Sequence, residues 1–325
     1  MCKVFVSKIN DDIEKKIHEA LKWIGWEKII QENSRVVIKP NFTFPTYKQG
    51  VTTSPQFLEG LVKVLKTRCG NITIGETDGG YYAWKAEEAF LNHNLYEIQK
   101  KYNVNIMNLY DSEIKHVQVE VGSKIYNIPL PKFLLENIDV FISVPVLKVH
   151  SMNKFTFGLK NQWGCILDPF RMRYHHIFKE AALKINELIA PKILISDPFY
   201  LLTDKGPMNG TVVPFNTLIA SDDIFAFERV GSKILGIDVE DVDYLSYAKK
   251  LGKLPSAKSI HTNNPIEPFC THQYNLKRTL KDKFVHKVFY SGFLTYLLYY
   301  SKFGILIHKI YYFLTGKKNK IKLNF

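Results

Sequence analysis

Short apolar runs alternate along this chain with segments of helical periodicity. Continuous apolar runs bounded by turn residues are typical of strands that are buried on both faces of a sheet. Apolar residues spaced three and four apart predict helices that pack one side onto such a sheet. The predicted strands are 35–41, 71–76, 104–109, 140–145, 192–197 and 215–221, and the predicted helices are 11–32, 54–66, 83–101, 178–189, 223–235 and 242–251.

The alternation of these elements predicts an α/β fold with a largely parallel sheet and helices on both faces. Ser54-Pro55 is a strong helix start, because serine caps the first turn and proline fits its first position. Segments 115–121 and 124–128 alternate between apolar and polar residues, which predicts an antiparallel hairpin, and 131–136 predicts a short helix. Residues 1–255 are therefore expected to form one α/β domain.

Cysteine usage and the N-terminus favour the cytoplasm. Cys2, Cys69, Cys165 and Cys270 are far apart in the chain and form no C-x-x-C pair. Closely spaced thiolates are needed to hold a zinc ion or an iron–sulfur cluster, so neither is expected. Residues 1–6 lack the apolar core of a secretion signal. We expect the protein to be cytoplasmic.

The formal charge of +13 is concentrated at the C-terminus. Residues 283–325 contain eight lysines and no acidic residue, so the preceding 282 residues carry only +13 − 8 = +5. The strongly basic balance therefore belongs to a C-terminal tail and not to the domain. Because that tail is aromatic and the domain shows no basic stripe, nucleic-acid binding is not expected.

Charged and amide side chains follow the predicted strands at their carboxyl ends. In open parallel sheets, ligands bind beyond these ends. The alternative is that strand ends simply become polar where they reach solvent. The residues concerned are Lys39 and Asn41, then Glu76 and Asp78, then Lys148 and His150, and finally Asp197.

The densest group of polar residues lies between positions 148 and 164. Lys148, His150, Lys160 and Asn161 could form a cradle for a phosphate or carboxylate. A solvated basic loop is the alternative, although the interleaved Phe155, Phe157 and Trp163 favour a segment that packs on the domain. Gly206 and Gly210 bracket a second loop that could approach a ligand.

Cofactor motifs are sparse. The chain has no G-x-G-x-x-G after a strand and no G-x-x-x-x-G-K-[ST], which excludes the usual dinucleotide and P-loop signatures. His150, His175 and His176 with Asp78 and Asp197 are candidate ligands for a divalent metal, but no H-x-x-x-H spacing supports this, and a structural or solvated role is favoured for each of them. The cofactor therefore stays unknown at this level.

Several stretches occur in an order that resembles a known family. They are Val-Val-Ile-Lys-Pro-Asn-Phe from Val36, Thr-Thr-Ser-Pro-Gln-Phe-Leu from Thr52, Ile-Thr-Ile-Gly-Glu-Thr from Ile72, Asp139 to His150, Gly158 to Gly164, Gly206-Pro207 to Gly210, and Ala220 to Asp238. Together they resemble the family called domain of unknown function 362, over roughly residues 36–255.

The resemblance leaves the activity open. Many members of that family carry an added ferredoxin-like cysteine module, which this chain lacks. Members often keep an aspartate near the position that Glu228 occupies here. The first strand–helix unit and the lysine–histidine segment are also distantly similar to α/β enzymes of the lactate racemase type.

The tail after a linker at 256–282 combines aromatic and basic residues. Residues 288–301 and 303–314 are apolar, but Lys302 and Lys309 interrupt them. A spanning helix needs about 20 apolar residues, so two short helices lying in the membrane interface fit better. The alternative is a tail that packs on the domain or forms a dimer interface.

Two functions of different class fit these features. The first is an enzyme that acts on an anionic metabolite, a class that includes lipid-linked and glycan-related compounds, at the cytoplasmic face of a membrane. Here Lys39, Lys148 and Lys160 would hold the anion, His150 would act as acid or base, and Asp78 or Asp197 would be a base or metal ligand. The second is a non-catalytic binding or assembly protein that is associated with the membrane.

Overall fold

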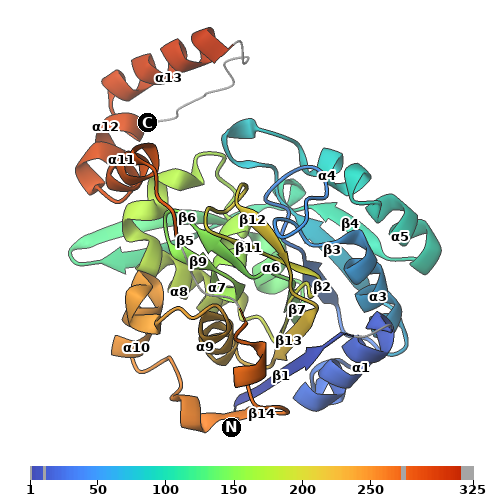
Figure 1. The fold of residues 1–325 in the computed structure, drawn as a ribbon. Helices are drawn as coiled ribbons and strands as arrows, with labels where there is room; N and C mark the ends of the chain where they lie inside the picture. The colour runs from blue at the N-terminus through green and yellow to red at the C-terminus, as the bar shows by residue number, and fades with distance from the viewer. Residues whose placement is uncertain (1, 10–11, 272–275, 316–325) are drawn as a thin grey trace.

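A mostly parallel sheet of eight strands forms the centre of the molecule (Figure 1). The computed structural model describes residues 2–9, 12–271 and 276–315. The strand order is β14-β1-β13-β10-β7-β2-β3-β4, and β13 is the strand that runs against its neighbours. The bounds are β1 Cys2–Lys8, β2 Val36–Lys39, β3 Ile72–Glu76, β4 Asn105–Asn108, β7 Val140–Ser143, β10 Ile193–Ile195, β13 Thr217–Ser221 and β14 Ile260–Thr262. The predicted α/β class is confirmed.

Helices cover both faces of this sheet. Successive strand residues point to opposite faces, so Val36 and Ile38 of β2 join one apolar core while Val37 joins the other. One core is covered by α1 Ile13–Ile24, α3 Pro55–Lys66, α4 Ala86–Asn92 and α5 Leu95–Tyr102. The other is covered by α6 Lys132–Glu136, α8 Phe178–Ile189, α9 Ile224–Ile234 and α10 Asp243–Lys250.

Local signals set the helix ends. The Asp12 and Ser54 side chains accept hydrogen bonds from the first turns of α1 and α3. The prediction of one helix over 11–32 was wrong, because Gly25 adopts φ 78° and ends α1 before the short α2 Trp26–Ile29. The predicted helix 83–101 is likewise divided, because Asn94 adopts the left-handed conformation between α4 and α5.

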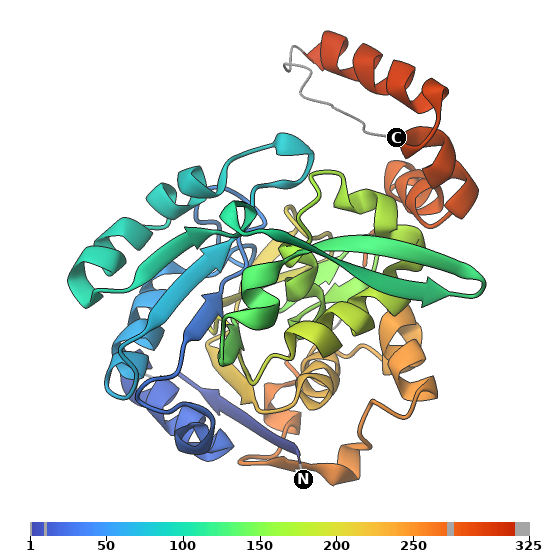
Figure 2. The ribbon, with the colours of Figure 1, turned by 180° about the vertical axis from the view of Figure 1, so that it is seen from behind.

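A second, smaller sheet was not predicted. It has the order β12-β11-β8-β9 and consists of β8 Lys148–His150, β9 Lys154–Thr156, β11 Tyr200–Thr203 and β12 Thr211–Pro214. The segment that could have been a solvated loop is thus a buried hairpin followed by α7 Gly158–Asn161. The predicted antiparallel hairpin is confirmed as β5 Ile114–Val121 and β6 Lys124–Pro131, which projects from the body (Figure 2).

The C-terminal part begins with a strand inside the predicted linker. β14 pairs in parallel with β1 and closes one edge of the sheet. Three helices follow, α11 Leu280–Phe289, α12 Gly292–Tyr299 and α13 Lys302–Thr315, and they lie at the opposite end of the molecule from β14 (Figure 1). Among the described residues, no helix is long and apolar enough to cross a membrane. The basic end of the predicted tail, 316–325, lies outside the described residues.

Candidate functional site

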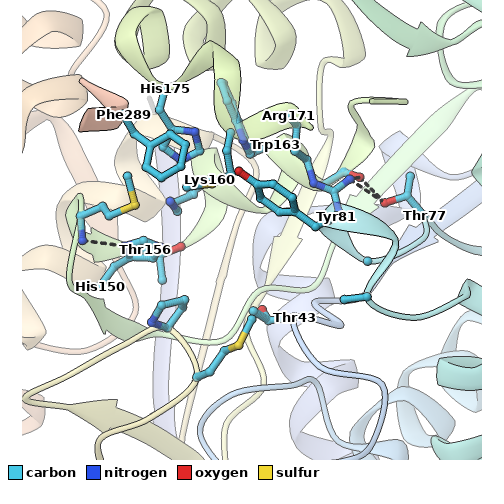
Figure 3. Close-up of a pocket in the computed structure, with 18 of the residues that line it drawn as sticks. Thr43, Thr77, Tyr81, His150, Thr156, Lys160, Trp163, Arg171, His175 and Phe289 are labelled. Carbon is cyan, nitrogen blue, oxygen red and sulfur yellow. Dashed lines mark hydrogen bonds between the residues drawn. The ribbon is translucent and has the colours of Figure 1, made fainter. Parts of the chain in front are cut away.

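A cavity of about 780 Å³ lies where the carboxyl ends of β2 and β3 meet the small sheet. It is lined by seven of the candidate binding and catalytic residues that the sequence singled out, and also by the candidate metal ligand His175; the seven are Lys39, Asn41, Glu76, Lys148, His150, Lys160 and Asn161. Figure 3 shows His150, Thr156, Lys160 and His175 on one side of the pocket and Thr77, Tyr81 and Arg171 on the other. The strand ends of two sheets therefore converge on one site.

Lys39 and Glu76 form an ion pair in the wall of this cavity. Both are almost fully buried, and the Lys39 Nζ lies 2.8 Å and 2.9 Å from the two carboxylate oxygens of Glu76. The backbone N–H groups of Phe42 and Thr77 donate to the same carboxylate. A Cβ added at Gly164 would lie 3.1 Å from the Lys39 Nζ, so glycine there leaves the pair room. The pair carries no net charge, and its carboxylate accepts hydrogen bonds from the Lys39 ammonium and from two backbone N–H groups.

Three other cationic groups of the cavity have no carboxylate partner among the described residues. Lys148, 1% exposed, donates to the backbone oxygen of Val51 at 2.5 Å and to the Thr43 Oγ1 at 3.1 Å. Lys160 donates to the Asn153 Oδ1 at 2.7 Å. The Arg171 guanidinium donates to backbone oxygens of the loops around it and to the Thr77 hydroxyl. We call Lys148, Lys160 and Arg171 the cationic site.

Burial shifts the protonation of the two lysines of this site. Desolvation, with repulsion from Lys160, lowers the pKa of Lys148 from 10.5 to about 7, and desolvation lowers the pKa of Lys160 to about 7. A bound anion would favour the charged form of both amines. Groups whose pKa lies near neutrality are also suited to accept and return protons. The cationic site can therefore hold an anion and move protons at neutral pH.

His150 is set up as a hydrogen-bond donor. Its Nδ1 accepts from the backbone N–H groups of Met152 and Asn153, at 3.1 Å and 3.4 Å, which leaves the proton of the neutral ring on Nε2. Burial and the nearby positive charges of Lys160 and Lys148 hold its pKa well below the usual value. The tautomer follows from the hydrogen bonds and differs from that of a general base, which needs a free Nε2 lone pair.

Asp78 and Asp197 lie outside the residues that line the cavity. The Asp78 carboxylate accepts from the Ala86 N–H, the Asn108 amide and the Lys85 ammonium. Asp197 accepts from the backbone and hydroxyl of Ser54, so it fixes the start of α3, and burial raises its pKa. Both carboxylates are occupied by structural hydrogen bonds.

The glycine loop also contributes differently from the expectation. Pro207 and Met208 line the cavity, while Gly206 and Gly210 pack against backbone. A Cβ on Gly206 would meet the Val149 oxygen at 1.7 Å, and a Cβ on Gly210 would meet the Thr203 oxygen at 2.4 Å. These glycines are required by the close packing of the loop on β8 and β11.

Glu228 is fully buried, and its hydrogen bonds have a structural role. Its carboxyl group accepts from the Leu159 N–H at the start of α7 and from the Tyr244 hydroxyl. Burial raises its pKa to about 8. It thereby anchors the helix that holds Lys160, from outside the cavity.

The described residues contain no preformed cluster of metal ligands. Among the described residues, no three His, Cys, Asp or Glu side chains lie together in a way that could hold a metal ion. His175 lines the cavity next to Trp163, and His176 packs against Tyr126. Of the candidate metal ligands, His150 and His175 share the cavity, whereas His176, Asp78 and Asp197 are not among its lining residues.

Sequence reasoning missed Arg171 and the whole contribution of the tail. Arg171 lies on a 3₁₀ helix, Arg171–Ile177, which is too short to show a periodic pattern of apolar residues in the sequence. The cavity is also lined by tail residues, which we call the tail wall: Val285, Phe289, Leu298, Tyr299, Ile307, His308 and Tyr311.

The chain is similar in sequence to a known family and to a thylakoid-associated protein. The sequence model of a family described as a domain of unknown function, DUF362, matches residues 36–233. The thylakoid-associated protein sll1697 of Synechocystis is 24% identical over 245 residues, which are 73% of this chain and 74% of that protein.

Two solved structures are also similar. The lactate racemase apoprotein of Thermoanaerobacterium thermosaccharolyticum aligns with a TM-score of 0.46 at 14% identity, over 73% of this chain and 57% of that one. A Thermotoga maritima protein aligns with a TM-score of 0.44 at 14% identity, over 75% of this chain and 60% of that one. This chain thus spans less than two thirds of either structure.

Proposed function

This chain belongs to the family described as domain of unknown function 362, and we propose that it is an enzyme that binds an anionic metabolite in the cavity at its strand ends. One observation carries the proposal: three cationic side chains line this cavity and have no carboxylate partner in the part of the chain that the structure describes. Burying unpaired charge is costly, so such a group is retained where a ligand supplies the counter-charge.

The roles follow from the contacts. Lys148, Lys160 and Arg171 would hold the anion, and His150 would donate a hydrogen bond from Nε2. Lys148 and Lys160 are the better candidates for proton transfer, because their pKa of about 7 matches a neutral working pH. The Lys39–Glu76 pair would shape the wall and leave little charge of its own for a substrate.

Anion binding should weaken as the pH rises. Lys148 and Lys160 are charged below their pKa of about 7 and lose protons above it. Because the anion prefers the charged amines, we expect the affinity for sulfate to fall about tenfold or more between pH 6 and pH 9. Sulfate keeps its charge in this pH range. A change in its affinity with pH, measured by calorimetry on the full chain, therefore reports only the protonation of the protein.

A matched lysine provides the control for this experiment. Lys192 is exposed, lies at the amino end of β10 and is remote from the cavity. Lys192→Met should leave the affinity and its pH dependence unchanged, whereas Lys148→Ala should remove most of both. Sulfate binding that is insensitive to Lys148→Ala and His150→Ala would place the anion elsewhere and refute the proposal.

A location at the cytoplasmic face of a membrane is the second part of the proposal. Exposed apolar side chains of α11–α13 include Phe284, Phe293 and Phe313, which are 69%, 73% and 86% exposed. Exposed lysines lie among them, and Lys283, Lys287, Lys302 and Lys309 have no acidic neighbour within 283–315. Aromatic residues with positive flanks suit an anionic lipid surface. The name of the Synechocystis relative, which refers to thylakoids, is consistent with this location.

Vesicle binding tests this location. The full chain should sediment with vesicles that contain about 30% phosphatidylglycerol and not with pure phosphatidylcholine vesicles, because the lysines need an anionic surface. Phe293→Ser should weaken the binding severalfold, while Ile125→Ser, a change at an exposed apolar residue of the β5–β6 hairpin, should not. Equal sedimentation of wild type and Phe293→Ser would contradict membrane contact through this tail and favour the alternative in which the tail packs on the domain or forms a dimer interface.

A further inference from the structure

The cavity has a cationic part, formed by the cationic site and His150, and an apolar part, formed mainly by the tail wall. Lys148 and His150 belong to β8, Lys160 belongs to α7, and Arg171 begins the 3₁₀ helix Arg171–Ile177. The tail wall faces them with Val285, Phe289, Leu298 and Ile307, and Trp84 and Phe42 extend the apolar lining. Figure 3 shows Phe289 next to His175 at the edge of this group.

The tail helices divide their residues between the cavity and the outside. Ile307 lines the cavity, whereas its neighbour Leu306 is 55% exposed and does not. Phe289 lines it, whereas Phe284 of the same helix is 69% exposed. Apolar residues on the outer side fit the membrane surface proposed above, but apolar residues on the inner side need a separate explanation, because they face a cavity and not a packed core.

The tail is fastened to the segment that orients the cationic site. The Arg278 guanidinium donates to the backbone oxygens of Ser151 and Met152, at 2.6 Å and 3.0 Å. The Asn153 amide donates to the Tyr290 hydroxyl at 2.5 Å, and the oxygen of the same amide accepts from Lys160. Asn153 therefore links the position of the tail helices, through Tyr290, to the position of Lys160.

The size of the cavity excludes a small anion as its full occupant. A volume of about 780 Å³ lies within the range of pockets that enclose ligands of drug size. Sulfate or a small carboxylate would occupy only the cationic part and would leave the tail wall in contact with water. Contact of that wall with a hydrocarbon group would instead release the water and gain free energy.

We propose that the ligand of this cavity is an anionic amphiphile, whose phosphate-, sulfate- or carboxylate-type head is bound by Lys148, Lys160 and Arg171 and whose hydrocarbon chain lies against the tail wall. This inference rests on the proposed function, since it uses the same cationic site. It adds the apolar half of the ligand, and it gives the tail helices a part in substrate recognition besides their contact with a membrane.

A series of alkyl sulfates tests this proposal, because the charge stays constant while the chain grows. The full chain is titrated at pH 6.5 with sulfate, butyl sulfate, hexyl sulfate and octyl sulfate, each below its micellar concentration. The expected gain is roughly threefold in affinity per methylene that becomes buried. Ile307→Asn should flatten this dependence on chain length, and the matched change Leu306→Asn should leave it as in the wild type.

The outcomes separate this inference from the proposed function. If sulfate and octyl sulfate bind equally well and both need Lys148, the amphiphile is refuted while the anion site stands. If no member of the series depends on Lys148, the proposed function fails as well. If affinity grows with chain length but neither Ile307→Asn nor Lys148→Met changes it, the chains bind the exposed surface of the tail, and the inference is overturned. Thermal unfolding of each variant, and sulfate binding by Ile307→Asn, verify that the cavity is intact.

Discussion

Glu76→Ala is expected to destabilise the protein by about 3–5 kcal/mol, because it leaves the Lys39 ammonium buried and unpaired. Lys39 is 1% exposed, and Glu76 is 3% exposed. The carboxylate also accepts from the N–H groups of Phe42 and Thr77, and these donors would lose their partner too. Urea unfolding at pH 7, followed by circular dichroism, measures the change.

The double variant Lys39→Met/Glu76→Leu removes both charges of the ion pair at once and so measures the pair as a unit. Removing both charges should recover much of the loss, because a well-packed apolar pair can replace a buried ion pair. Lys101→Ala, which breaks the exposed pair with Glu59, should cost far less than Glu76→Ala, because water screens an exposed ion pair. If Glu76→Ala costs no more than Lys101→Ala, Lys39 is not held by Glu76 and is available to bind a ligand, as the sequence had suggested.

Lys148→Met is expected to change stability in the opposite direction and to abolish anion binding. Lys148 is as buried as Lys39 but has no carboxylate partner among the described residues. Methionine fills a similar volume without the desolvation cost of an ammonium group, so we expect a gain of about 1–3 kcal/mol at pH 6 despite the loss of the hydrogen bond to Val51. The affinity for sulfate should fall by roughly a factor of 100, as for the loss of a buried charged contact.

The direction of the pKa shift of Lys148 determines how the stability gain of Lys148→Met changes with pH. The pKa of Lys148 is about 7 in the folded protein and 10.5 in its ordinary state. Between these values the unfolded chain binds more protons, so the free energy of unfolding of the wild type rises with pH. The advantage of Lys148→Met is therefore largest below pH 7 and shrinks towards pH 10. Differential scanning fluorimetry across this range measures it, and a variant that is less stable than wild type at pH 6 would contradict an unpaired lysine.

These two lysines show how far sequence reasoning reaches. Lys39 and Lys148 both follow an apolar run in the sequence, and in the structure both line the same cavity. The sequence cannot tell that Lys39 is neutralised by Glu76, because that pairing depends on the adjacency of β2 and β3 and on the packing around Gly164. The same holds for Asp78 and Asp197, whose carboxylates serve backbone N–H groups that no local pattern reveals.

The remaining differences have physical causes as well. The strands β8, β9, β11 and β12 have three or four residues each, which is too short for a periodic signal. The tail was expected to be apolar and basic, and it is. That its inner side lines the cavity depends on the contacts of Arg278 and Tyr290 with the segment 151–153, over a separation of more than 120 residues.

The most direct test of the anion site is a crystal structure of the full chain with octyl sulfate. The account predicts a sulfate group within hydrogen-bond distance of the Lys148 and Lys160 Nζ atoms and of the Arg171 guanidinium, with the alkyl chain against Leu298 and Ile307. A structure in which the sulfate group lies only on exposed lysines such as Lys302, while the cavity holds water, would contradict it.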